Sequence, residues 1–172
     1  MVKVIFRYSW IYDEQWKNLT NRKTSWNKPY PSAKKIQKFI KKAGKLWHKD
    51  ERQVLQTMEK ITGLKWKKDV TCYVVGNCIP FSEPLTLPVI EKYPDYFIDT
   101  LVHELLHQFL FIQNESETKK AWSFIFQKYR KESLNTKIHI PVHAVHKNIY
   151  LKIGLIFCQR RQRWSAKDVG GL

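Results

Sequence analysis

Cysteine is scarce in this 172-residue chain, which contains only Cys72, Cys78 and Cys158. Three cysteines cannot all pair, and their spacing fits neither a zinc ribbon nor a disulfide framework. We therefore expect reduced thiols that are mostly buried, as small apolar side chains usually are.

Long apolar runs are also missing. No stretch reaches the roughly 18–20 apolar residues that a membrane-spanning helix needs. The first residues, Met1 to Arg7, are too short and too interrupted by charge to be a secretory signal. We expect a cytoplasmic protein with no membrane partner. The sequence also lacks a glycine-rich phosphate loop and a serine-nucleophile motif.

Acidic residues are few: 15 Asp and Glu face 31 Lys and Arg, a formal net charge of +16. Much of the excess lies between Lys17 and Lys68, and more lies at Arg160, Arg161, Arg163 and Lys167. Such a charge attracts nucleic acid, acidic proteins or anionic membranes, and it also keeps a protein soluble. Composition alone does not separate these roles.

Hydrophobic residues make up 43% of the chain, enough for a core, and their spacing predicts an α+β fold. Ser32 is a good N-cap for a lysine-rich helix that Gly44 breaks or bends, and Gly63 fits the C-cap of a second helix. Strands are expected at Val2–Tyr12, Asp69–Gly76 and Leu85–Ile90, with a loop at Asn18–Pro31. Helices are expected at Asp50–Thr62, from Pro94 to about Ile112, from Ser116 or Glu117, and from near Pro141 to about Cys158. We expect one domain over residues 1–158 and a basic tail over residues 159–172.

The sequence His103-Glu104-Leu105-Leu106-His107 carries the strongest functional signal. Two histidines four apart project from one face of a helix, so both imidazoles can reach one metal ion at about 2.0–2.1 Å. Glu104 is rotated away from direct ligation, but it can reach a metal-bound water and act as general base. Apolar residues surround the motif, and polar groups on a buried helix need a partner that satisfies them. The motif therefore predicts one zinc ion (Zn2+).

With this motif the chain resembles the zincin metallopeptidases, in a minimal single-domain form. The resemblance covers residues 103 to 107 strictly, and the layout from Val70 to Tyr150 loosely. It implies a zinc-dependent metallopeptidase that hydrolyses peptide or protein substrates, with His103 and His107 as ligands and Glu104 as base. It also implies a small zincin-like domain, in which a twisted mixed β-sheet packs on the metal-binding helix and C-terminal helices follow. By analogy Leu85–Ile90 is the edge strand that pairs with substrate.

A catalytic zinc needs a third protein ligand. The Gly-x-x-His version of the motif is excluded, because no histidine stands at the sixth position after His107. His139, His143, His146 and Tyr150 form one stripe at helical spacing. We favour His143 as third ligand, with His146 or Tyr150 directed at the oxyanion of the tetrahedral intermediate. His139, His146, Glu132 and Glu117 remain alternative ligands, and Asp99, Gln108 and Asn114 are candidates for supporting the ligands.

Two other interpretations stay open. The basic composition fits a nucleic-acid-associated protein, whose metal site is structural or which cleaves proteins bound to DNA. The tail beyond Cys158 could also fold into the cleft of a latent or degenerate zincin.

Overall fold

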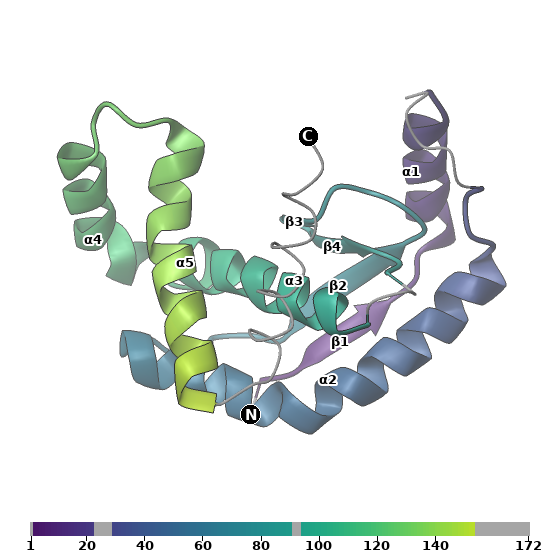
Figure 1. The fold of residues 1–172 in the computed structure, drawn as a ribbon, viewed down its shortest axis with the longest axis horizontal. Coiled ribbons are helices and arrows are strands. Elements are labelled where there is room, and N and C mark those ends of the chain that lie inside the picture. The colour runs from purple at the N-terminus through teal and green to yellow at the C-terminus, as the bar shows by residue number, and fades with distance from the viewer. Residues whose placement is uncertain (1, 23–28, 91–93, 154–172) are drawn as a thin grey trace, which may run out of the picture.

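A computed structural model describes residues 2–22, 29–90 and 94–153 of the chain, and these form the expected α+β arrangement (Figure 1). The predicted boundary between a domain of residues 1–158 and a tail of residues 159–172 lies outside the described residues and stays a prediction. In chain order the elements are β1 (Val4–Arg7), α1 (Trp10–Arg22), α2 (Ala33–Thr62), β2 (Val70–Val75), β3 (Phe81–Ser82), β4 (Leu85–Pro88), α3 (Pro94–His107), the π-helix η1 (Gln108–Gln113), α4 (Glu115–Lys128) and α5 (Leu134–Ile153).

The strands form one mixed sheet in the order β1-β2-β4-β3. β1 and β4 both run parallel to β2, whereas β3 runs antiparallel to β4. The expectation that Leu85–Ile90 forms the sheet edge was wrong, because β4 pairs with β2 on one side and with β3 on the other. The edge on this side is β3, and Pro88 lies beyond the two residue pairs that join β3 to β4.

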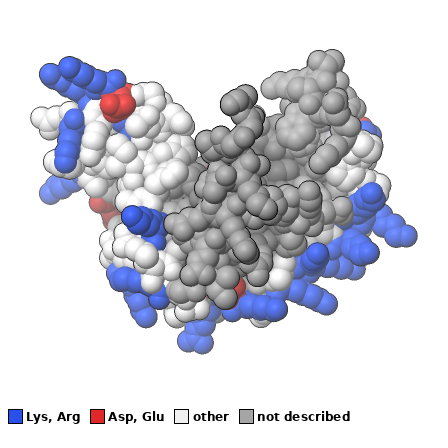
Figure 2. Space-filling model, viewed as in Figure 1, with Lys and Arg blue, Asp and Glu red and all other residues white. Residues whose placement is uncertain are grey.

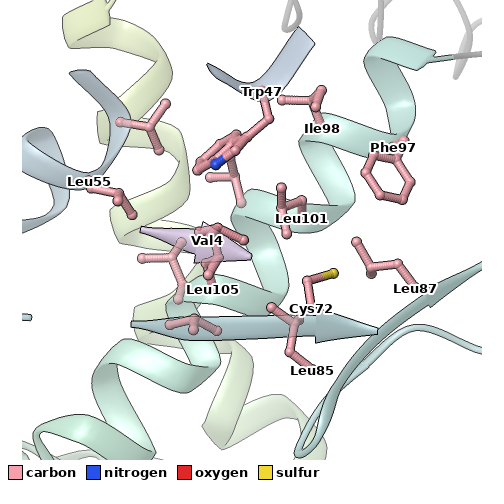
Figure 3. Close-up of a cluster of buried hydrophobic side chains, with 14 of the residues drawn as sticks. Val4, Trp47, Leu55, Cys72, Leu85, Leu87, Phe97, Ile98, Leu101 and Leu105 are labelled. Atoms are coloured by element: carbon pink, nitrogen blue, oxygen red, sulfur yellow. The ribbon is translucent and has the colours of Figure 1, made fainter. Parts of the chain in front are cut away.

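The two faces of the sheet carry different helices. Alternate residues of β2, among them Cys72, are buried in the core beside α2, and α3 contacts β3 and β4. Figure 3 shows Leu101 of α3 and Trp47 of α2 directed into this core. On the other face Tyr73 of β2 contacts Tyr12 of α1, with ring centroids 5.4 Å apart. The motif helix α3 therefore packs against one face of the sheet.

α2 is one continuous helix of 30 residues, and the predicted break at Gly44 was wrong. The expected caps are confirmed, since the Ser32 side chain accepts a hydrogen bond from the Lys35 amide and Gly63 adopts a left-handed φ of 74°. Buried apolar residues continue along one face of α2 on both sides of Gly44, which explains why one glycine does not end the helix. These residues are Ile36, Phe39, Ala43, Trp47, Val54, Leu55 and Met58.

Two other predicted boundaries were wrong. The strand predicted over Val2–Tyr12 ends at Arg7, and the predicted Asn18–Pro31 loop begins inside α1, because α1 runs to Arg22. Ser9 starts α1: its carbonyl accepts from the Asp13 amide at 2.9 Å and its hydroxyl from the Tyr12 amide at 3.4 Å.

The last helix begins earlier than the sequence predicted. α5 begins at Leu134, where Ser133 Oγ accepts from the Thr136 amide at 3.0 Å. Pro141 consequently lies inside the helix and not near its start. This shift places His139 on the helix together with His143.

The described residues share one buried apolar cluster, drawn from β1, α2, β2, β4, α3, η1 and α5. Cys72 and Cys78 are buried free thiols, as expected, and Cys158 lies outside the described residues. Within the described ranges, no helix combines the length and the apolar character needed to cross a membrane.

Candidate metal centre

The first pair of histidines lies on α3, which is fixed by its buried apolar side chains. His103 and His107 are half-buried, and their Nε2 atoms are 3.3 Å apart. A tetrahedral zinc with Zn–N bonds of 2.0–2.1 Å separates two of its nitrogen ligands by about 3.4 Å. The spacing of this pair therefore matches two neighbouring ligands of one zinc ion.

A second pair of histidines faces the first from α5, which crosses α3 in Figure 1. The His139 ring lies 5.3 Å from that of His103 and 4.9 Å from that of His107. The His143 ring lies 5.4 Å from that of His103. His103, His139 and His143 each have one ring nitrogen that lies within 4.8 Å of a ring nitrogen of the other two. His107 is not part of this compact group, but its ring lies 4.9 Å from that of His139.

His139, like His143, lies close enough to the histidines of α3 to supply the third ligand. The Nδ1 atom of His139 lies 2.8 Å from the carbonyl oxygen of Asn135. Because a carbonyl can only accept, Nδ1 carries the proton and the lone pair is left on Nε2. A hydrogen bond of this kind orients many metal-binding histidines. The sequence underrated His139 because Pro141 was expected to lie near the helix start.

The histidines of α3 are suited to bind a cation at neutral pH. Burial, followed by the nearby imidazoles, lowers the pKa of His103 from 6.5 to about 3. Burial and the His139 and His143 rings lower the pKa of His107 to about 4. Both rings are therefore neutral near pH 7, and each keeps the lone pair that a metal requires.

Glu104 is a buried carboxyl group with 8% of its surface exposed. Among the residues that the structure describes, no hydrogen bond or ion pair reaches its side chain. Burial raises the pKa of Glu104 from 4.5 to about 7. A carboxyl group with a pKa near neutrality can both accept and return a proton, which is what a general base requires.

His146 and Tyr150, which the sequence placed near the oxyanion, form a buried cluster with Asp99 of α3. His146 Nε2 lies 2.9 Å from the Tyr150 hydroxyl oxygen, and that hydroxyl donates to the Asp99 carboxylate. His146 Nε2 also lies 3.5 Å from Asp99 Oδ1. The cluster joins α5 to α3 beside the candidate ligands, since the His146 and His103 rings are 5.7 Å apart. The oxyanion role of His146 and Tyr150 stays a prediction.

The two glutamates considered as alternative ligands, Glu117 and Glu132, are not placed to bind the metal. Glu117 forms an ion pair with Lys67 at 2.7 Å. Hydrogen bonds from Lys67 and Ser116 lower the pKa of the Glu117 carboxyl group to about 2. Glu132 is exposed in the turn between α4 and α5. The compact group of candidate ligands found among the described residues contains neither.

Two amides expected near the ligands serve other contacts. Gln108 of η1 donates to the Ser82 carbonyl and to Glu83 Oε2, the latter at 2.9 Å, and so ties the end of the motif helix to the β3–β4 turn. Asn114 donates to the Lys65 and Phe109 carbonyls at 3.1 and 3.0 Å. Gln108 therefore fixes the sheet edge beside the motif, and Asn114 fixes the end of η1.

Comparison of the chain with protein-family models, with curated proteins and with solved structures gives no match in any of the three.

Proposed function

We propose that this protein is a zincin-like, zinc-dependent metallopeptidase. The observation that carries the proposal is the meeting of two histidine pairs, His103 with His107 on α3 and His139 with His143 on α5, beside the buried Glu104. Imidazole nitrogen is a favoured ligand of zinc, and the 3.3 Å spacing on α3 suits tetrahedral coordination. We assign His103 and His107 as ligands, with the third ligand from α5, either His143 or His139.

The chemistry follows from this donor set. A zinc ion held by these histidines would lower the pKa of a bound water and polarise the scissile carbonyl. Glu104 removes the proton from the attacking water and passes it to the leaving amine. Its burial supports this role, because a carboxyl group with a raised pKa holds a proton long enough to return it.

The sheet supports the same proposal. An extended peptide can add to an exposed strand at a sheet edge through its main chain. β3 is the edge strand on the side of the motif, and Gln108, the residue after His107, contacts its Ser82 carbonyl. We propose that substrate pairs along this edge and not along β4.

A structural metal site is the second candidate function. Four imidazoles from α3 and α5 lie around one region, one more than a catalytic zinc uses. If all four bound one ion, no position would remain for water, and the site could stabilise the fold without hydrolysing a bond.

The experiment that tests the proposal measures zinc content and peptidase activity on the same preparations. Glu104→Gln should keep zinc at the wild-type level and lose turnover of an unstructured protein substrate by at least about a hundredfold, the typical contribution of a general base. Glu132→Gln, the same change in an exposed turn, is the control and should keep activity. Retained activity in Glu104→Gln would refute the mechanism.

The third ligand is identified with single substitutions. His143→Ala and His139→Ala should differ, because only one of these residues is needed for a three-histidine site. Loss of zinc in just one variant identifies the ligand. Equal loss in both, combined with an inactive wild-type protein, would favour the four-histidine structural site.

A further inference from the structure

α2 exposes a line of cationic side chains along the side that faces solvent. Intervals of four and three residues place the members on one helical face, and their side chains are all exposed: Lys34, Lys38, Lys41, Lys45, Lys49 and Arg52. We call this set the α2 basic stripe. At 1.5 Å per residue it extends for about 27 Å. Because α2 is unbroken at Gly44, the stripe is continuous along the helix.

The charge of the stripe is uncompensated over most of its length, because Asp50 and Glu51 are the first acidic residues of α2. Residues 33–49 contain no Asp or Glu, and Lys35 and Lys42 add further positive charge beside the stripe. Among the described residues, no ion pair involves a member of the stripe. Glu51 is buried and accepts a hydrogen bond from the Val4 amide at 2.7 Å. Figure 2 shows the resulting band of Lys and Arg along the lower edge of the molecule, over α2.

The chemistry of the stripe selects its partner. A membrane-binding helix needs an apolar face for the lipid, but the apolar face of α2 is already buried against β1, α3 and α5. Binding of single-stranded nucleic acid usually relies on exposed aromatic rings that stack on bases. The large hydrophobic side chains exposed in the described residues include none from α2. The exposed face of α2 instead offers a row of cations, whose spacing suits the regular phosphates of a duplex.

We propose that the α2 basic stripe binds the phosphate backbone of double-stranded nucleic acid without reading its sequence. The stripe spans the length of about eight base pairs at 3.4 Å each. It lies on the side of α2 opposite the side that packs on α3 and α5, so a bound duplex leaves the histidine cluster uncovered. This inference does not depend on the proposed peptidase function.

The test uses the full chain and a labelled DNA duplex of about 20 base pairs, longer than the stripe, with affinity measured between about 50 and 200 mM salt. Six phosphate contacts predict a slope of log affinity against log salt of about −5. The triple variant Lys38→Gln, Lys41→Gln, Lys45→Gln should reduce the size of this slope by about 3 and weaken binding by at least about tenfold. Glutamine and lysine have similar helix propensities, so α2 should be retained, and circular dichroism checks this.

The control removes the same charge from exposed lysines elsewhere, with Lys119→Gln, Lys120→Gln, Lys131→Gln. This variant should bind duplex nearly as well as the unaltered protein. Equal weakening in both triple variants would overturn the proposal, because only net charge would then matter. Tighter binding to a single strand of the same length, or binding to vesicles with anionic lipid but not to duplex, would also overturn it.

Discussion

The Asp99–Tyr150–His146 cluster leads to a prediction that separates a positioning role from a catalytic one. Tyr150→Phe removes only a hydroxyl group, from a side chain with 8% of its surface exposed. That hydroxyl donates to the Asp99 carboxylate and lies 2.9 Å from His146 Nε2. A hydrogen bond to a charged group contributes about 2 kcal/mol. For a chain of this length such a loss lowers the melting temperature by about 4–8 °C.

The assay is thermal and denaturant unfolding of metal-free Tyr150→Phe, together with kcat of the zinc-loaded protein. Tyr96→Phe is the matched control, because Tyr96 lies on α3 with 53% of its surface exposed and should leave stability unchanged. If the cluster fastens α5 to α3, stability falls and kcat changes modestly. Unchanged stability with a loss in kcat of about a hundredfold or more would refute this reasoning and favour the oxyanion role.

Two further predictions concern stability. In the metal-free protein, burial lowers the pKa of His103 and His107 below the ordinary value of 6.5, so the unfolded chain binds more protons at both sites. The free energy of unfolding should therefore fall as pH drops from about 7 to about 4, partly offset by the raised pKa of Glu104, and urea titrations across this range would measure it. Gly76→Ala should lower the denaturation midpoint, at a cost of about 1–3 kcal/mol, because a Cβ atom would lie 2.6 Å from Cζ of Tyr30; an unchanged midpoint would show that this ring can move.

The sequence correctly predicted those helices and strands that are determined by a few neighbouring residues. Ser32 and Gly63 mark the two ends of α2, and the structure has both caps. The β-branched run before Gly76 became β2. The motif at His103 lies on a helix because apolar residues surround it at helical spacing.

Tertiary contacts decided the features that the sequence predicted wrongly. Gly44 does not interrupt α2, because the apolar stripe on either side is buried against the same core. β4 became an inner strand because a two-residue strand too short to recognise, β3, pairs with its outer side.

The sequence predicted only those residues of the candidate site whose proximity follows from helix geometry. His103 and His107 are neighbours through helix geometry alone, which spacing reveals. The approach of His139 depends on where α5 begins and on how it crosses α3, and no local pattern specifies either. The Asp99 contact with Tyr150 joins residues far apart in sequence, so it required the packed helices.

The central claim is that histidines of α3 and α5 hold one zinc ion and leave a position open for water. X-ray absorption at the zinc edge on the zinc-loaded protein tests this most directly, with metal content measured on the same sample. We predict one zinc per chain, bound by three imidazoles and one oxygen ligand at about 2.0–2.1 Å. A protein that retains no zinc, or that keeps it after His103→Ala and His107→Ala together, would contradict the site. Four imidazoles with no oxygen would contradict its catalytic role.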